Sequence, residues 1–114
     1  ELVFFLRDFL GDHLPESEIR LLAGMCRYEP LAGGEAVYSS GEAAAKVYIV
    51  FEGAVSRSSA GVEISSLGVG SVFGEAGLLS EGFTYHTSDV RAVTGSVTVL
   101  LSIFTEQVQE YVPG

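Results

Sequence analysis

The sequence is poor in cationic residues and has a single cysteine, and both shortages exclude functions. Six Lys and Arg residues stand against fifteen Asp and Glu residues, for a net charge of −9. A chain without a basic patch has little to neutralise phosphates, so we expect neither nucleic-acid binding nor binding to an anionic membrane surface. Cys26 alone can form no internal disulfide and no thiolate metal cluster. These features favour a reducing compartment, the cytoplasm, and predict no metal or other cofactor.

Long apolar runs and asparagine are also missing. No apolar run approaches the roughly 20 residues that span a bilayer, so we expect no direct membrane insertion. Without Asn, the sequence has no N-glycosylation sequon. The chain begins without Met, and we expect it to be a segment of a longer protein.

Glycine is abundant, and the apolar pattern predicts one small, mainly β domain. The chain has 114 residues, 47% of them hydrophobic, with 14 Gly and three Pro. Apolar side chains recur at helical spacing only near the two ends, and glycines separate short apolar runs between them. The sequence therefore predicts a helical lead-in over 1–26, about eight strands within 27–101, and a helix over 102–114 that begins near Ser102.

Catalytic groups do not gather in this sequence. Of its two histidines, His13 lies in the helical lead-in. His86, Ser88 and Asp89 are too close together on one strand to form a nucleophilic triad, which brings groups together from separate segments. Two distant histidines also cannot supply the ligand cluster of a metal site. We therefore predict a binding module and not an enzyme.

Two ordered signatures resemble those of the cyclic nucleotide-binding domain family. The first comprises Gly34-Glu35-Ala36-Val37-Tyr38, Gly41-Glu42, Val47-Tyr48-Ile49-Val50 and Gly53-Ala54-Val55. The second comprises Phe73-Gly74-Glu75-Ala76-Gly77-Leu78-Leu79 and, further on, Val90-Arg91-Ala92. The family includes the regulatory subunit of protein kinase A, the catabolite activator protein and cyclic nucleotide-gated channels.

The resemblance implies a fold. It covers the chain from about Ile19 to the C-terminus, so the whole of 1–114 is expected to be one cyclic nucleotide-binding-like domain. The implied fold is an eight-stranded, jelly-roll-like β-roll over 27–101 with N-terminal helices. A short helix lies within the phosphate-binding cassette, residues 73–92, and 102–114 are the start of a C-terminal helix.

The resemblance also implies a regulatory function and a binding site. In family members the ligand lies against the cassette, where backbone N–H groups at a helix start bind the cyclic phosphate. Glu75 corresponds to the carboxylate that accepts the ribose 2′-OH. The implied ligand is cAMP, cGMP or a related purine nucleotide or nucleoside, and an attached output domain or partner subunit outside this chain would respond to it. The expected ligand-binding residues are Phe73, Gly74, Glu75, Ala76, Gly77, Leu78, His86, Thr87 and Ser88.

One departure from the family pattern affects the phosphate site. Family members that bind cyclic nucleotides usually have an Arg five residues before the Arg of Val-Arg-Ala, and this sequence has His86 there. The loop 80–85 is about two residues longer than usual, and no Lys or Arg occurs between Arg57 and Arg91. A charge-assisted hydrogen bond contributes roughly 1.5–3 kcal/mol, so its loss lowers affinity by about 10–150-fold.

Each of these residues also has a structural interpretation. Glu75 is also an acid favoured at a helix N-terminus, and Gly74 and Gly77 suit tight backbone geometry. His86 is a phosphate partner, a protonation switch or a solvated loop residue. Thr87 and Ser88 are also ordinary strand formers, and Arg91 usually has a structural role. Two functions therefore stay open: a ligand-sensing module, or a degenerate fold that serves domain packing or oligomerisation.

Overall fold

The structure, a computed structural model, describes residues 15–74, 85–95 and 97–107. The first of the predicted N-terminal helices, the cassette helix and most of the predicted C-terminal helix lie outside these ranges. The described helix is α2 (Glu16–Met25). The described strands are β1 (Arg27–Leu31), β2 (Ala36–Tyr38), β3 (Lys46–Glu52), β4 (Val55–Ser59), β5 (Val62–Leu67), β6 (Val72–Phe73), β7 (Asp89–Ala92) and β8 (Thr98–Phe104).

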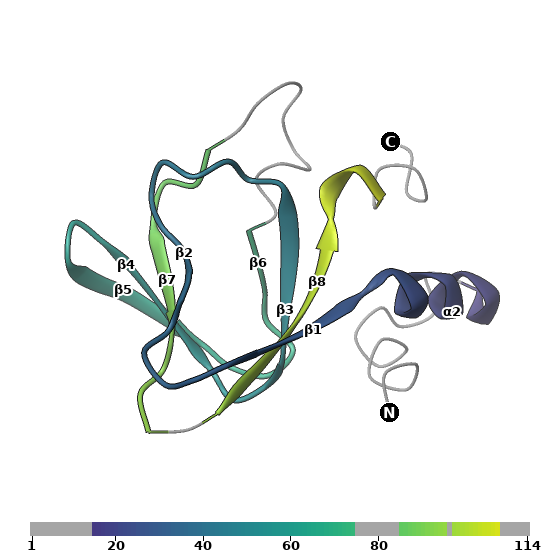
Figure 1. The fold of residues 1–114 in the computed structure, drawn as a ribbon, viewed down its shortest axis with the longest axis horizontal. Helices are drawn as coiled ribbons and strands as arrows, with labels where there is room; N and C mark the ends of the chain where they lie inside the picture. Colours follow the sequence, from purple (N-terminus) through teal and green to yellow (C-terminus); the bar gives the residue numbers. More distant parts are fainter. Residues whose placement is uncertain (1–14, 75–84, 96, 108–114) are drawn as a thin grey trace.

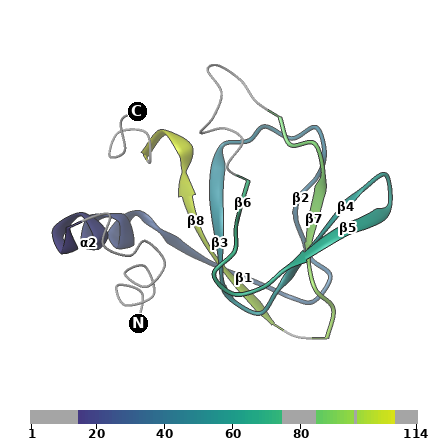
Figure 2. The same cartoon turned by 180° about the vertical axis from the view of Figure 1, so that it is seen from behind.

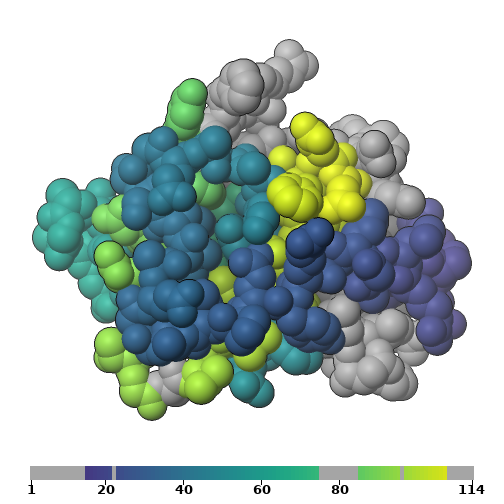
Figure 3. Space-filling view, viewed as in Figure 1, coloured from purple at the N-terminus to yellow at the C-terminus, as the bar shows by residue number. Residues whose placement is uncertain are grey.

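The strands form two four-stranded antiparallel sheets. Their orders are β1-β8-β3-β6 and β2-β7-β4-β5, so strands that are distant in the sequence become neighbours. Figure 1 shows the two sheets facing each other, with α2 beyond the end of β1, and the reverse view in Figure 2 agrees. The face seen in Figure 3 is formed largely by β1, β2 and the segments that follow them. The predicted mainly β roll is confirmed.

Local signals explain the position of α2. Pro15 precedes it, and the Pro15 carbonyl accepts hydrogen bonds from the N–H groups of Glu18 and Ile19. Glu16 and Glu18 lie in the first turn, where carboxylates favour the positive end of the helix dipole. Ile19 is buried and anchors the helix. No described helix has the length and apolar character needed to cross a membrane.

The core lies between the inner faces of the two sheets. Its buried members are Leu31, Tyr38, Tyr48, Val50, Val55, Phe73, Val90, Ala92 and Leu100. β3 and β7 each contribute two alternate residues, because successive side chains of a strand point to opposite faces. β8 is central in its sheet, and Leu100 and its neighbour Leu101 are both buried.

β8 continues past the predicted start of the last helix. Ser102 pairs with Tyr48, and Phe104 pairs with Lys46, so the ladder with β3 extends to residue 104. Thr105 then donates its N–H to the carbonyl of Ala45 at 3.0 Å. The predicted boundary after residue 101 was therefore wrong. Backbone pairing with β3 holds this segment extended, although its apolar spacing also suits a helix.

The β4–β5 hairpin turns through two residues with positive φ. Ala60 has φ 52° and Gly61 has φ 81°, which is the backbone of a type I′ turn. Glycine and asparagine suit such positions, whereas the Cβ of alanine crowds the backbone there. Ala60 is the only non-glycine residue with positive φ among the described residues. The turn is therefore a point of local strain in the fold.

Replacing Ala60 with Gly should raise the free energy of unfolding by up to about 1 kcal/mol. The left-handed conformation costs alanine about 1–2 kcal/mol, and this exceeds the roughly 0.4–1 kcal/mol that glycine loses through its freer unfolded chain. Urea unfolding measures the difference. Ala32→Gly, at an exposed position without positive φ, should instead lower stability. A loss of stability in both variants would show that Ala60 is not strained.

Two buried hydroxyl groups on the inner face of β8 differ in their partners. Thr98 Oγ1 donates to the carbonyl of Ala54 at 3.0 Å and accepts from the Ala54 N–H at 3.3 Å. Ser102 Oγ is buried as well, but it has no hydrogen-bond partner among the described residues. A buried hydroxyl without a partner costs roughly 1–3 kcal/mol, whereas a bonded one stabilises modestly.

Ser102→Ala should therefore raise the free energy of unfolding by about 1 kcal/mol, because it removes an unpaired polar atom. Thr98→Val should lower it by about 1–3 kcal/mol, because the Ala54 groups lose their partner. Thermal unfolding of the two variants beside the unsubstituted chain measures both effects. Destabilisation by Ser102→Ala of the same size as by Thr98→Val would show that the Ser102 hydroxyl is bonded in solution.

Candidate functional site

Four aromatic side chains meet between the two sheets at one end of the roll. They are Tyr38 of β2, Tyr48 of β3, Phe73 of β6 and His86, which precedes β7, and we call them the aromatic cluster. The imidazole of His86 lies parallel to the Tyr38 ring, with centroids 3.5 Å apart and an interplanar angle of 4°. Tyr48 and Phe73 also stack, at 5.2 Å and 12°. The Tyr38 centroid lies 6.0 Å from that of Tyr48 and 6.1 Å from that of Phe73.

Strand pairing brings these rings together. Tyr48 and Phe73 are directly opposite residues of β3 and β6, so their side chains share the inner face. His86 is held by its backbone. Its N–H donates to the carbonyl of Glu42, and its carbonyl accepts from the N–H of Gly41, both at 2.8 Å. The loop after β2 therefore fixes His86 beside Tyr38, the last residue of β2.

Both ends of the cassette segment 75–84 border the aromatic cluster. Gly74, which precedes the segment, has φ +77°. A Cβ on Gly74 would lie 3.1 Å from Cδ2 of Tyr48 and 3.2 Å from the carbonyl oxygen of Lys46, which is too close for most side chains. His86 follows the segment closely and stacks on Tyr38. The residues that the sequence assigns to the ligand thus begin and end at this cluster.

The expected site residues fall into three groups. Phe73, Gly74 and His86 belong to or border the aromatic cluster, although the Phe73 ring is only 1% exposed and acts as a core side chain. Thr87 is exposed and Ser88 half-buried. The remaining expected residues, Glu75, Ala76, Gly77 and Leu78, lie outside the described residues. Within the described residues, no three His, Cys, Asp or Glu side chains are arranged to hold a metal ion.

His86 is not a solvated loop residue. Its side chain is 7% exposed, and burial lowers its pKa. The nearby Glu42 carboxylate acts in the opposite direction but with less effect. The imidazole is therefore held in its neutral form, which offers one hydrogen-bond donor and no charge.

Carboxylates lie near the aromatic cluster. Burial raises the pKa of Tyr48 to about 12, and the negative charges of Glu29 and Glu42 add to this effect, as does Tyr38. Glu29 accepts a hydrogen bond from Lys46 Nζ at 3.4 Å. The electrostatic environment of Tyr48 is therefore negative, with the charge of Glu29 partly balanced by Lys46.

Arg91 does not point to a ligand. Its Nη1 donates to the carbonyl of Gly34 at 3.1 Å and so ties β7 to the turn before β2. This agrees with the structural interpretation of the Val-Arg-Ala motif. The Lys46 ammonium lies 5.4 Å from the centroid of the Phe104 ring, a cation–π distance that helps to hold it beside Glu29.

Sequence reasoning missed three residues of this end of the roll. Tyr38 and Tyr48 were recognised only as parts of the first signature, and Glu42 was given no role. A signal was present, because both tyrosines lie in short apolar runs at strand length, which predict buried strands. Such runs indicate that the residues are buried, but they do not show that the two rings meet each other or His86.

Comparisons with known proteins agree with this fold. The sequence profile described as the cyclic nucleotide-binding domain matches residues 28–112. The cAMP-bound PfPKA-R structure is similar at 18% identity and a TM-score of 0.82, covering 95% of this chain and 37% of that chain. A comparison with curated proteins found no match.

Two further solved structures are similar. The regulatory domain of Toxoplasma gondii PKA with cAMP is 25% identical, with a TM-score of 0.82, covering 96% of this chain and 43% of that chain. The regulatory subunit of a cAMP-independent protein kinase A from Trypanosoma cruzi, bound to guanosine, is 23% identical, with a TM-score of 0.81, covering 95% and 39%. This chain thus spans less than half the length of these three chains.

The buried His86 should make the fold less stable at mildly acidic pH. Its pKa is about 6.5 in the unfolded chain and lower in the folded chain. As pH falls below about 6.5, the unfolded chain takes up the proton first, so stability is lost until the folded pKa is reached. His86→Phe keeps an aromatic ring stacked on Tyr38 but removes the titrating group. It should therefore lose less of its free energy of unfolding between about pH 7.5 and about pH 5.5 than the original chain.

Urea unfolding at the two pH values measures this loss. His13→Gln is the control, because it leaves His86 as the only histidine and should retain the His86 contribution. An equal pH dependence in the original chain and in His86→Phe would mean that His86 titrates normally in the folded state.

Proposed function

Because the chain belongs to the cyclic nucleotide-binding domain family, we propose that it is a regulatory module that binds a purine nucleotide or nucleoside. Binding is passed on to an attached domain or a partner subunit. One observation carries the proposal: Gly74 and His86, at the two ends of the cassette segment, both border the aromatic cluster. A ligand that binds the cassette therefore acts beside the most firmly packed part of the roll.

The proposed mechanism uses binding without chemistry. Glu75 accepts the ribose hydroxyl, and backbone N–H groups of the cassette supply further hydrogen bonds. A ligand that binds one arrangement of the cassette more tightly than another shifts the protein toward that arrangement, and this shift is the signal. Similar structures hold cAMP in one case and guanosine in another, which supports a purine ligand. We place the module in the cytoplasm, since its one cysteine is free.

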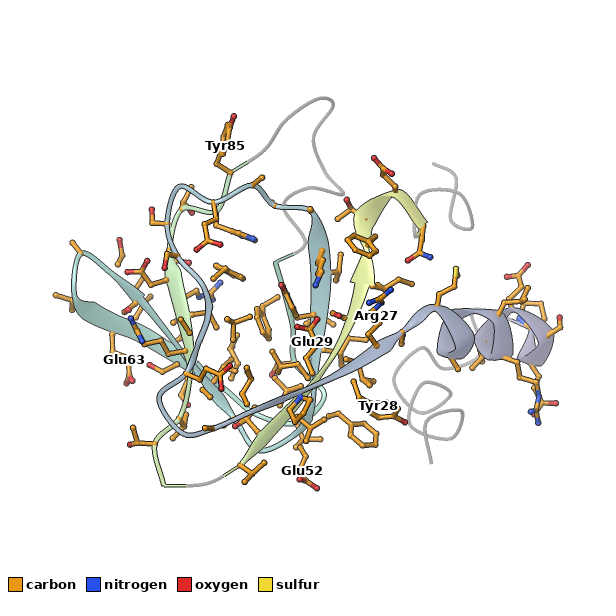
Figure 4. All side chains as sticks on the ribbon, in the orientation of Figure 1. Arg27, Tyr28, Glu29, Glu52, Glu63 and Tyr85 are labelled. Atoms are coloured by element: carbon orange, nitrogen blue, oxygen red, sulfur yellow. The ribbon has the colours of Figure 1, made fainter. Side chains whose placement is uncertain are left out.

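Calorimetric titration of the chain with cAMP, cGMP, adenosine and guanosine tests the proposal. At least one of the four should bind. Glu75→Ala should weaken that binding by roughly 10–150-fold, because the ribose hydroxyl loses a charged acceptor. Glu52→Ala is the control, because it removes the same charge from an exposed position at the last residue of β3. Figure 4 shows Glu52 pointing away from the roll, so this variant should bind the ligand normally.

The second candidate function is a degenerate member of the family that serves domain packing or oligomerisation. The stack of His86 on Tyr38 favours it, because the resemblance predicts a phosphate-binding arginine at this position and the ring of His86 is instead packed against Tyr38. Absence of binding by all four compounds would support this candidate and exclude the ligand-sensing module. Unchanged binding by Glu75→Ala would instead keep the module and remove Glu75 from the site.

A further inference from the structure

The ring of His86 cannot act as a substitute for a guanidinium in its present position. It lies flat against Tyr38 at 3.5 Å, so one of its faces is covered, and only 7% of the residue is exposed. Its backbone N–H and carbonyl are both hydrogen-bonded to the loop, at Glu42 and Gly41 respectively. A long arginine side chain can extend to a phosphate, whereas a short ring in this stack stays with Tyr38.

The Lys and Arg side chains of the described residues either have partners of their own or lie away from His86. Four of the five are engaged: Arg20 with Glu16, Lys46 with Glu29, Arg57 with Ser65 and Arg91 with the Gly34 carbonyl. The fifth is Arg27, and Figure 4 shows it beside β8. In the same view Tyr85, the neighbour of His86, lies above β7 and apart from Arg27, and it forms an isolated bridge with Ala43. No described cation is therefore placed beside His86.

The residues outside the described ranges add little positive charge. The segment 75–84 contains Glu75 and Glu81 but no Lys or Arg, and 108–114 contains Glu110 but no Lys or Arg. Arg7 is the only Lys or Arg in the undescribed part of the chain. The segment 75–84 therefore has two carboxylates in its sequence and no cation.

Carboxylates, by contrast, do act on the aromatic cluster. The charge of Glu42 affects both His86 and Tyr48, and that of Glu29 affects Tyr48 from the β1 side. Glu29 forms an ion pair with Lys46. Glu42 has no cationic partner among the described residues. Its carboxylate instead accepts a hydrogen bond from the Ser39 N–H at 2.8 Å. An anion that enters beside His86 thus meets an unbalanced negative charge.

We propose that this site takes an uncharged purine ligand, a nucleoside or a free base, and rejects the phosphorylated forms. The inference rests on the proposed function, since it specifies the ligand class of the same site. An anion that leaves water needs strong compensation from a cation or several donors. The proposed backbone N–H donors of the cassette are available to either ligand, but the described residues at this end of the roll offer a phosphate neither an available cation nor a charged imidazole. Repulsion by Glu42 adds to the discrimination, because like charges disfavour the wrong ligand.

A titration of the unsubstituted chain tests this without any substitution. Adenosine or guanosine should bind at least about tenfold more tightly than the corresponding cyclic nucleotide. The affinity of the nucleoside should not change with salt, whereas that of the cyclic nucleotide should rise as salt screens the repulsion. A cyclic nucleotide that binds more tightly, with an affinity that falls as salt increases, would overturn the proposal and reveal a cation contact.

His86→Arg supplies the missing charge and should raise the affinity for cyclic nucleotides by about 10-fold or more, with little change for nucleosides. Ser66→Arg is the matched control, because it adds the same charge on exposed β5 and should change neither affinity. If the buried Arg prevents folding, Glu42→Gln serves instead, since it removes the repelling charge at an exposed position. It should raise cyclic nucleotide affinity by about 1.5–5-fold.

The outcomes separate the two proposals. Preference for a nucleoside supports both. Preference for a cyclic nucleotide overturns the uncharged ligand but keeps the ligand-sensing module. Binding of none of the four compounds overturns the module, and the uncharged ligand with it. Equal nucleoside and cyclic nucleotide affinities at all salt concentrations would show that the phosphate stays in water, which also overturns discrimination at this site.

Discussion

The packing of the Tyr38 ring holds together the end of the roll that carries the aromatic cluster. It packs against Tyr48 and Phe73 from one sheet and lies parallel to His86, which leads into the other sheet. Through these contacts one side chain joins both sheets and both ends of the cassette. Aromatic pairs of this kind contribute about 0.5–1.5 kcal/mol beyond the burial of their area.

This packing has a consequence for the charge of the site. A buried imidazole that stacks on a ring is stable as a neutral group, because burial penalises its charged form. An arginine at the same position keeps its charge in nearly any setting. His86, at the position where the resemblance predicts an arginine, is a buried ring stacked on Tyr38.

The rest of the roll supplies the rigidity that this arrangement needs. β8 is the inner partner of both β1 and β3, and its ladder with β3 runs from Val99 to Phe104. That ladder holds Tyr48 opposite Ser102 and sets the inner face on which Glu29 and Lys46 also lie. Strain is present at Ala60, which turns the β4–β5 hairpin. Ser58 of this hairpin pairs with Asp89 at the start of β7, three residues after His86.

Local patterns in the sequence were enough to predict the roll. Glycines at turns, such as Gly34, Gly41 and Gly53, all have positive φ, and short apolar runs mark the strands between them. The two signatures also predicted the family, whose sequence profile matches residues 28–112. These features depend on neighbouring residues, so one sequence is sufficient to recognise them.

The tertiary structure alone decided the end of β8 and the state of His86. Ser102 and Phe104 stay extended because β3 pairs with them, and no local pattern records that distant ladder. The stack of His86 on Tyr38 joins residues that are far apart in the chain. Whether an imidazole carries charge depends on how much water its neighbours exclude, and those neighbours are known only once both sheets are in place.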